Sequence, residues 1–478
     1  MEIDGRPVVA TVAHIVVQRG PLGVLSIVLM NIAAILSLRN LPLLAPYGLG
    51  MIFFYAIAAL GFFIPVALIS AELASLMPEE GGLYAWLRAA FGECIAFFGV
   101  WISLITTVTA LTMTLVFIAG AVAYGLSPAL AASRPFSCLA IVVLTWGATA
   151  ISLKGMALSA RVTGLATVFG TCIPGCLIAV LGLIWLFSGQ PSGMPASSIL
   201  PKLNNLANLS FLSGVLFAFS GLEMSAYHVL DVANPGRSYP RAIFLSTLSI
   251  LTLSVLGSLA IATIVPASEL RLEVGVVQAL TLGLRRVHLG WLAPVVGFCI
   301  AFGGIAYVFA WMAGPSRGLL ATRTSGVLPP WLQRTNGHGM PVAILLCQAA
   351  VITVCAMLFL CVPTISLGFW ALNAVSAVLM LAMYLFLFLA GPILRVKMPT
   401  AHRSYRIPFG RWGMAAASLA GLASASFSIV LAFILPTELF GTMSSDRFFA
   451  TVLAGTLLLG APPFLFYALR RPAWRPSN

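Results

Sequence analysis

The chain has 478 residues, of which 60% are hydrophobic and only 8% are charged. A soluble globular domain is typically ~45–50% apolar and ~25% charged, so this composition excludes an ordinary soluble enzyme. The formal net charge of +13 does not indicate nucleic-acid binding, because the basic residues stand in short stretches between apolar runs and form no stripe with aromatic residues. The composition predicts a polytopic membrane protein.

Twelve apolar segments are long enough to cross a bilayer as helices, which takes ~20 largely apolar residues. They cover about residues 24–48, 50–75, 94–126, 136–153, 162–188, 209–232, 242–265, 291–313, 341–361, 366–391, 413–435 and 448–469. We therefore predict an all-α protein whose residues 1–478 form a single transmembrane domain. The predicted helices fall into three groups: helices 1–5 at about 24–188, helices 6–10 at about 209–391, and helices 11–12 at about 413–469.

Lys and Arg in the connecting stretches predict the orientation, because cytoplasmic loops carry an excess of both. With both termini on one side, most of the basic residues fall on that side. The opposite side holds only Arg134, Lys202, Arg271, Arg285, Arg286 and Arg447, and Arg39 lies inside a segment. Both termini are therefore predicted to be cytoplasmic, and residues 1–20 show no cleavable signal peptide.

The polar connections hold no soluble domain. The longest are 189–208 and 266–290 on the outer side, and 314–340 and 392–412 on the inner side. After segment 2, residues 83–91 form an amphipathic stretch that is predicted to be a short helix on the membrane face or the bundle. The eight cysteines form no CxxC pair, so we expect no metal site and no cofactor.

Ionisable side chains inside an apolar segment cost several kcal/mol unless they face a cavity or a partner. Arg39 lies in segment 1, and Glu223 lies about halfway along segment 6. Glu72, His228 and Asp231 lie nearer the ends of their segments, where a loop cation or packing can satisfy them. Arg39 either contacts the ligand or pairs permanently with Glu223 or a helix end, and the sequence leaves both readings open.

Segments 1 and 6 also carry helix-breaking residues. Segment 1 contains Ser37-Leu38-Arg39-Asn40-Leu41-Pro42, and proline removes a helical donor. Segment 6 contains Ser220-Gly221 directly before Leu222-Glu223. Two broken helices in corresponding positions of two five-helix units are a pointer to a transporter site. Freed N–H and C=O groups would bind the carboxylate and ammonium of an α-amino acid.

Several motifs resemble those of the amino acid–polyamine–organocation superfamily. Pro78-Glu79-Glu80-Gly81-Gly82-Leu83-Tyr84-Ala85-Trp86 is similar to its cytoplasmic signature. The stretch from Ser220 to Ala242, which includes Asn234-Pro235-Gly236-Arg237, resembles the sixth helix of bacterial glutamate/γ-aminobutyrate antiporters. Gly314-Pro315-Ser316-Arg317-Gly318 is similar to the same family. The resemblance covers essentially the whole chain.

The resemblance implies twelve helices in a five-plus-five inverted repeat (LeuT-like) with helices 1 and 6 broken. It also implies alternating access, and exchange of amino acids or their decarboxylation products across a bacterial inner membrane. Glu223 matches the glutamate that these antiporters use in pH-dependent transport, and Trp311 matches an aromatic of the substrate pocket. Tyr307 lies one helical turn before Trp311. The Gly-Ser-Gly step common in the first helix is replaced by Ala34-Ile35-Leu36-Ser37. Because the chain ends at Asn478, we expect no pH gate of the C-terminal tail type.

The predicted substrate site combines the residues at both breaks with polar and aromatic residues of other segments. It comprises Ile35, Leu36, Ser37, Arg39, Thr107, Phe219, Ser220, Gly221, Tyr307, Trp311 and Asn373, with Glu223 as the proton-coupling or pH-sensing residue. Thr106 and Ser376 are further pocket candidates.

The leading hypothesis is a secondary antiporter for a glutamate-like or neutral polar amino acid, because the always-charged Arg39 would repel cationic ligands. An exchanger of basic amino acids or polyamines and an amino-acid sensor without net flux are the alternatives. A channel or a membrane enzyme lacks its expected motifs. The expected partners are a small amino acid or amine, membrane lipid and protons, with the chain a monomer or a homodimer and no nucleic acid bound.

Overall fold

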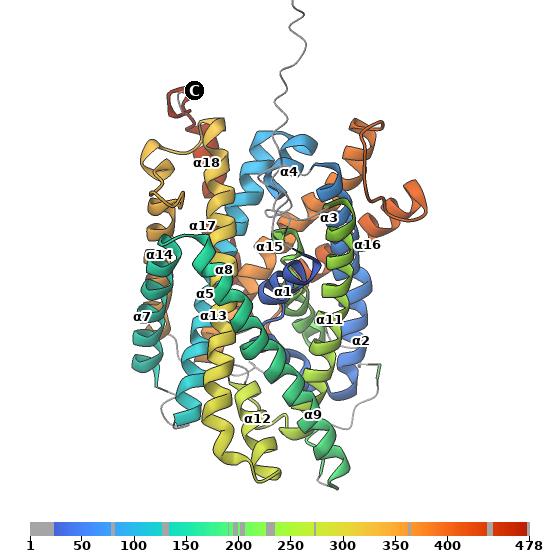
Figure 1. Ribbon diagram of the computed structural model, residues 1–478, viewed down its shortest axis with the longest axis vertical. Helices are drawn as coiled ribbons and strands as arrows, with labels where there is room; N and C mark the ends of the chain where they lie inside the picture. The colour runs from blue at the N-terminus through green and yellow to red at the C-terminus, as the bar shows by residue number, and fades with distance from the viewer. Residues whose placement is uncertain are drawn as a thin grey trace, which may run out of the picture.

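The computed structural model describes residues 23–77, 82–126, 133–189, 191–194, 199–200, 206–225, 235–271, 274–361, 365–436 and 443–475. Within these ranges the regular structure is helical, apart from an isolated bridge between Thr335 and Pro341. Most of the long helices run side by side along the long axis of the molecule (Figure 1). The predicted all-α class is confirmed.

The helices follow one another along two halves of the chain. The first half contains α1 (Val24–Ile35), the 3-10 helix η1 (Leu38–Gly50), α2 (Met51–Ala58), the π-helix η2 (Ala59–Phe63), α3 (Ile64–Leu76), α4 (Leu83–Phe91), α5 (Glu93–Leu126), α7 (Arg134–Leu153), α8 (Met156–Thr167), the π-helix η3 (Val168–Cys172) and α9 (Ile173–Phe187). The second half contains the short 3-10 helix η4 (Leu206–Leu209), α10 (Phe211–Ala218), α11 (Pro235–Ile264), α12 (Gly275–Arg286), η6 (Gly290–Leu292), α13 (Ala293–Ala321), η7 (Thr322–Ser325), η8 (Pro330–Gln333), α14 (Val342–Cys361), α15 (Ile365–Lys397), α16 (Gly410–Ala432), α17 (Ser445–Gly460), α18 (Pro462–Ala468) and η10 (Pro472–Trp474).

The helices agree with a polytopic membrane protein. Within the described ranges, nine helical stretches are long and apolar enough to cross a membrane. Three shorter apolar helices accompany them, at Val24–Ile35, Phe211–Ser225 and Val342–Met357. The count of twelve spans and the inverted repeat stay predictions.

Segment 1 is interrupted as predicted: α1 ends at Ile35, and the chain continues as η1, where Pro42 and Pro46 have no N–H to donate. The connection 266–290, which was expected to be polar and on the outer side, differs from the prediction because it contains the helix α12. This helix is amphipathic and buries Val276, Ala279 and Leu280 along one face. Its sequence therefore contains no long apolar run that would have indicated a helix. The short helix predicted at 83–91 is confirmed as α4.

The core of the bundle is built around α5. In the membrane-length apolar part of α5, 94% of the residues are buried. In the stretch Ser445–Ala468 at the periphery, the share is 17%. Both α13 and α15 pack along α5. α13 also approaches η3 closely, since a Cβ added to Gly170 would lie 2.1 Å from the backbone N of Gly303. The two broken segments pack against this central group, since α1 contacts α13 and α10 contacts α15.

Candidate substrate-binding site

The first break separates α1 from η1. Leu36 has φ −77° and ψ 82° and leaves the helix, and Ser37 is extended at φ −92° and ψ 120°. The indole Nε1 of Trp311 donates to the carbonyl oxygen of Ala34 at 2.7 Å. This bond satisfies a carbonyl at the end of α1 that has no partner within the helix. A side chain of α13 therefore holds the end of α1.

The second break follows α10, which ends at Ala218. Gly221 has φ 118°, a value that residues with a Cβ rarely adopt. Its N–H donates to the hydroxyl of Tyr384 at 2.7 Å. A Cβ on Gly221 would lie 2.8 Å from Cζ2 of Trp311 and 3.4 Å from Cγ1 of Ile35. The prediction of helix breaks at both positions is confirmed, and the glycine is required by its backbone conformation and by close packing.

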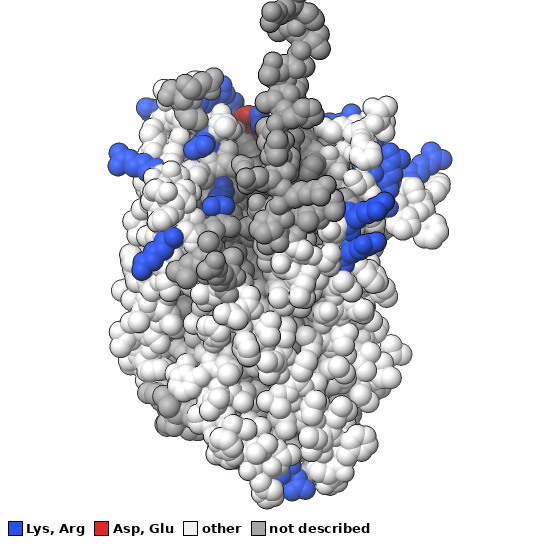
Figure 2. Space-filling model, in the orientation of Figure 1, with Lys and Arg blue, Asp and Glu red and all other residues white. Residues whose placement is uncertain are grey.

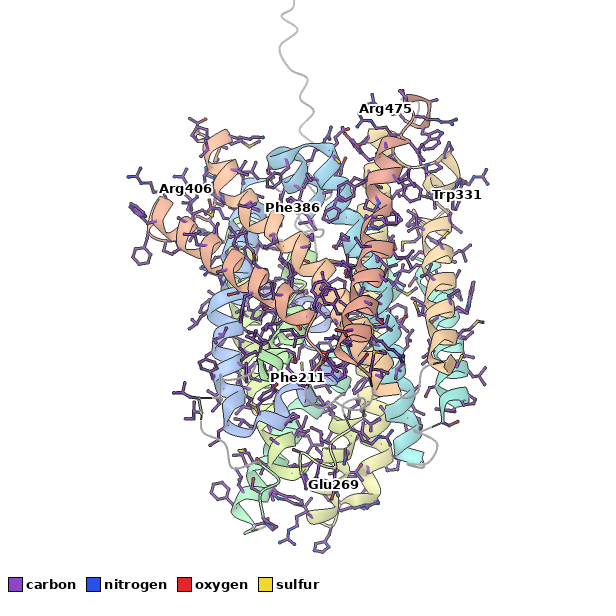
Figure 3. The ribbon with its side chains drawn as sticks, turned by 180° about the vertical axis from the view of Figure 1, so that it is seen from behind. Phe211, Glu269, Trp331, Phe386, Arg406 and Arg475 are labelled. Carbon is purple, nitrogen blue, oxygen red and sulfur yellow. The ribbon has the colours of Figure 1, made fainter. Side chains whose placement is uncertain are left out.

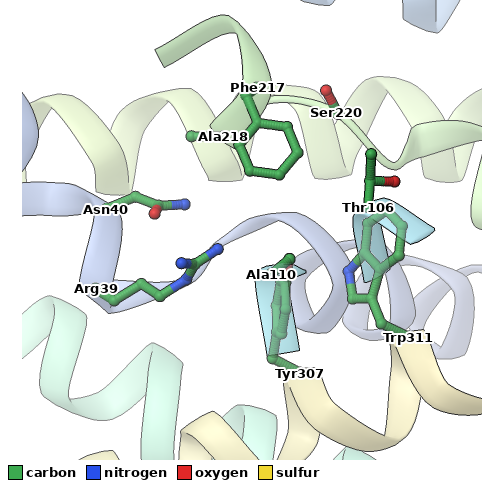
Figure 4. A pocket seen from close by; sticks show the side chains of 9 residues that line it. All are labelled: Arg39, Asn40, Thr106, Ala110, Phe217, Ala218, Ser220, Tyr307 and Trp311. Carbon is green, nitrogen blue, oxygen red and sulfur yellow. The ribbon is translucent and has the colours of Figure 1, made fainter. Parts of the chain in front are cut away.

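Two small cavities lie between these breaks. The first is lined by Arg39, Asn40, Thr106, Ala110, Phe217, Ala218, Ser220, Tyr307 and Trp311 (Figure 4). The second is lined by Ile35, Leu36, Ser37, Asn40, Leu41, Leu43, Tyr55, Val215, Ala218, Phe219 and Ser254. Asn40 and Ala218 line both, so the two cavities are adjacent and meet at the broken segments.

Arg39 brings a positive charge to the first cavity. Its side chain is 2% exposed, and Nε and Nη1 have no hydrogen-bond partner among the residues that the structure describes. Cζ lies 5.5 Å from the centre of the Tyr307 ring, within the range of a cation–π contact. Within the described ranges no ion pair joins Arg39 to Glu223. The guanidinium therefore has free donors at the wall of the cavity.

Glu223 follows the second break by two residues in the sequence and lines neither cavity. Its side chain is fully buried. The hydroxyl of Tyr384 on α15 donates to Oε2, while Oε1 has no hydrogen-bond partner in the described part of the chain. The same hydroxyl accepts the N–H of Gly221. One phenol thus joins the carboxyl group to the backbone at the break.

The structure brings many of the predicted site residues together. Arg39, Ser220, Tyr307 and Trp311 line the first cavity, Ile35, Leu36, Ser37 and Phe219 line the second, and Gly221 contacts Trp311. Thr107 and Asn373 line neither cavity. The Thr107 hydroxyl donates to Ser103 O at 2.7 Å within α5, and the amide of Asn373 lies against Gly214. His228 and Asp231 lie outside the described residues.

Sequence reasoning missed several lining residues. Asn40 directly follows Arg39 and lines both cavities, and its polar side chain inside an apolar segment was an available signal. Tyr55 and Ser254 line the second cavity from α2 and α11. Phe217, Ala218 and Ala110 carry no signal, because small and apolar residues are the ordinary content of a membrane helix.

Among the described residues Glu72 is a second buried carboxylate, and it lies toward the C-terminal end of α3, where it forms ion pairs. Arg395 donates to its two carboxylate oxygens at 2.7 and 2.5 Å, and Arg403 Nε lies 3.5 Å from Oε1. The N–H of Ile407 donates to Oε2 at 2.8 Å. The expectation that a loop cation satisfies Glu72 is confirmed for Arg403, while Arg395 lies in the last turn of α15.

Comparison with known proteins decides the family. Residues 22–459 match the sequence profile of the family described as "Amino acid permease". The chain belongs to the amino acid permease family. This permease is 37% identical over 446 residues to an uncharacterised transporter of Legionella pneumophila, covering 93% of this chain and 96% of that protein. It is 28% identical over 447 residues to a glutamate/gamma-aminobutyrate antiporter of Lactococcus lactis, covering 92% and 89%.

A more distant relative is the human Asc-type amino acid transporter 1, which is 28% identical over 351 residues and covers 70% of this chain and 63% of that protein. The family and these relatives are transporters, so the resemblance to the amino acid–polyamine–organocation superfamily and the expectation that the chain is not an enzyme are both confirmed. The permease is an amino acid transporter with a multi-pass membrane architecture.

Proposed function

We propose that this permease is a secondary antiporter for an acidic or neutral polar amino acid. It exchanges this substrate for a related amino acid or its decarboxylation product by alternating access. The observation that carries the proposal is the buried Arg39, whose Nε and Nη1 have no partner among the described residues and which lines a cavity between two broken helices. The glutamate/gamma-aminobutyrate antiporters of Lactococcus lactis, similar over most of their length, support the exchange mode.

The chemistry of the cavity favours a substrate with two carboxylates. A guanidinium presents a planar fork of donors that matches a carboxylate, and it stays charged at all accessible pH values. Backbone groups at the two breaks would bind the α-carboxylate and the ammonium. The second carboxylate of an acidic amino acid would then neutralise Arg39, whereas a cationic amino acid or polyamine would face uncompensated repulsion.

The proposed orientation has both termini in the cytoplasm of a bacterial cell, with the protein in the inner membrane. Figure 2 shows Lys and Arg side chains gathered toward one end of the visible face, with few at the other end. Figure 3 shows Arg406 and Arg475 toward the first end and Glu269 toward the second. This asymmetry supports the assignment of the basic end to the cytoplasm.

Counterflow into proteoliposomes tests the proposal. Vesicles loaded with unlabelled glutamate should take up labelled glutamate or a neutral polar amino acid, and empty vesicles should not. A panel that includes arginine, agmatine and a polyamine distinguishes the alternatives, because an exchanger of basic substrates would take up these compounds instead. Binding of an amino acid without counterflow would identify a sensor and refute the antiporter.

Arg39→Met tests the specificity, since methionine keeps an unbranched side chain and removes the charge. A hydrogen bond to a charged group contributes roughly 1.5–3 kcal/mol, so the apparent affinity for acidic substrates should fall about 10- to 100-fold. Neutral substrates should lose much less. Arg447→Met, at an exposed arginine of α17, is the matched control and should leave uptake unchanged. An equal loss for every substrate would make Arg39 a structural residue.

A further inference from the structure

The connection between α15 and α16 projects from the side of the bundle. We call residues 396–412 the α15–α16 hairpin. In Figure 1 it forms the orange-red protrusion near one end, and in Figure 3 its labelled residue Arg406 lies at the outer edge of the molecule. Three of its large apolar side chains are strongly exposed: Val396 at 81%, Phe409 at 88% and Trp412 at 73%. The hairpin thus reaches beyond the bundle at the end where Lys and Arg gather.

Phe409 adopts a backbone conformation that bulky residues avoid. Its φ is 62° and its ψ is 19°, and within the described ranges only His288 is a second non-glycine residue with positive φ. Such a conformation is disfavoured by contact between Cβ and the backbone. Packing against the protein does little to offset this cost, because the phenyl ring is almost fully exposed. A strained, exposed aromatic residue is explained if the ring is buried in something outside the chain.

The hairpin also has cations without counter-ions in the described part of the chain. Arg406 and Arg411 are exposed and form no hydrogen bond or ion pair with the described residues, although Arg411 Cζ lies 5.7 Å from the centre of the Trp412 ring. The sequence contains no Asp or Glu between Glu273 and Glu438. Glu72 of α3 reaches the hairpin, but Arg395, Arg403 and the N–H of Ile407 already occupy its oxygens. The exposed guanidinium groups of Arg406 and Arg411 therefore have no counter-ion among the described residues.

The hairpin is held in a defined position by the bundle. Besides the contacts of Glu72, the hydroxyl oxygen of Ser75 lies 3.0 Å from Tyr405 O and accepts the N–H of Tyr405 at 3.3 Å. Arg403 Nη2 donates to Leu394 O at 3.1 Å. These bonds fix the backbone on both sides of Arg406. The two exposed guanidinium groups and the two exposed rings thus lie on one short segment whose backbone is held by the bundle.

We propose that the α15–α16 hairpin binds the headgroup of an anionic phospholipid. Arg406 and Arg411 contact the phosphate oxygens, and Phe409 and Trp412 enter the interfacial region beside the headgroup. Arg is well suited to phosphate because its donors form a planar fork, and tryptophan is enriched at membrane interfaces. The proposal requires only that the chain crosses a membrane, and it is independent of the amino acid that the permease carries.

Native mass spectrometry of the purified full-length protein tests this site without any transport measurement. The protein is titrated with phosphatidylglycerol and, separately, with phosphatidylcholine. Because each basic residue near an anionic surface contributes a modest attraction, Arg406→Gln with Arg411→Gln should weaken phosphatidylglycerol binding roughly 10- to 30-fold and leave phosphatidylcholine binding unchanged. Arg285→Gln with Arg286→Gln, an exposed pair at the end of α12, is the matched control. Unchanged lipid binding in the hairpin variant, or an equal loss in the control, would overturn the proposal.

Phe409→Gly separates a lipid contact from a structural role. Glycine tolerates the positive φ, so this variant should unfold at the same or a higher temperature than the wild type. It should nevertheless bind phosphatidylglycerol more weakly. Wild-type lipid binding in Phe409→Gly would contradict the proposed contact between the Phe409 ring and the lipid. Inorganic phosphate at the same concentration as phosphatidylglycerol should not displace the bound lipid. Displacement would show that the hairpin binds free anions and not a lipid headgroup.

Discussion

Gly221 offers the sharpest test of the site, because two independent features of the structure forbid a side chain there. Its φ of 118° is unfavourable for any residue with a Cβ, and that Cβ would lie 2.8 Å from Trp311 Cζ2. The backbone effect alone is about 1–3 kcal/mol. The contact with Trp311 adds to it, because the indole is held by its bond to Ala34 O and has little freedom to move. Gly221→Ala should therefore destabilise the fold at the break by at least ~1–3 kcal/mol and abolish or strongly reduce counterflow.

The matched control is Gly147→Ala in α7. A Cβ added to Gly147 meets no atom within 4 Å, and the residue is helical and exposed. Alanine should stabilise the helix there by about 0.5–1 kcal/mol. Thermal unfolding in detergent compares the two variants, and counterflow with reconstituted protein reports on function. The two substitutions add the same methyl group. Opposite effects on the unfolding temperature would therefore be due to the local geometry at Gly221.

A double substitution identifies the cause of the loss. Trp311→Phe removes the ring atom that contacts the added Cβ and also removes the donor to Ala34 O. If the contact matters, Trp311→Phe should be less damaging in the Gly221→Ala background than in the wild type. Wild-type stability and counterflow in Gly221→Ala would refute the reasoning, because the second break would then tolerate an ordinary residue and could not be built as the structure describes.

Three further substitutions probe the buried charges. Glu223→Gln should flatten the pH profile of counterflow while the protein remains folded, and an unchanged profile would exclude a pH-sensing role. Tyr384→Phe should alter the same profile, because it removes the hydroxyl that joins Glu223 to the Gly221 backbone; an altered affinity at one pH with an unchanged profile would contradict this link. Glu72→Gln leaves Arg403 unpaired at 3% exposure and should cost ~3–5 kcal/mol in unfolding. The control Glu93→Gln breaks an exposed pair with Arg88 and should cost less than ~1 kcal/mol; similar losses would refute the contrast.

Much of the helical pattern could be predicted from the sequence, because membrane helices are long and apolar. The segment at 94–126 agrees with α5 (Glu93–Leu126) almost to the residue. The breaks were also predictable, since proline and glycine act locally through the backbone. Glu72, Arg39 and Glu223 stood out for the same reason, because a charged residue in an apolar segment is costly wherever it lies.

The partners of those residues could not be predicted, because they come from distant parts of the chain. Tyr384 bonds Gly221 and Glu223 across more than 160 residues of sequence, and an aromatic residue in a membrane helix carries no signal of such a role. Thr107 shows a second limit of the sequence argument. Its hydroxyl looked available for a ligand, but serine and threonine in helices often bond the carbonyl one turn earlier, as Thr107 does with Ser103.

The two breaks are coupled through side chains of helices that are themselves continuous. Trp311 of α13 bonds the end of α1 and contacts Gly221, and Tyr384 of α15 bonds Gly221 and Glu223. While Oε2 of Glu223 carries no proton, the Tyr384 hydroxyl can donate to it and still accept from Gly221. A proton on Oε2 would compete for that phenol oxygen and leave the phenol proton in need of another acceptor. Protonation at Oε2, as distinct from Oε1, would thereby weaken the bond that holds the backbone at Gly221, and through Trp311 it would affect the end of α1. Such a chain of contacts gives a carboxylate outside the cavity a physical route to the residues that form its walls.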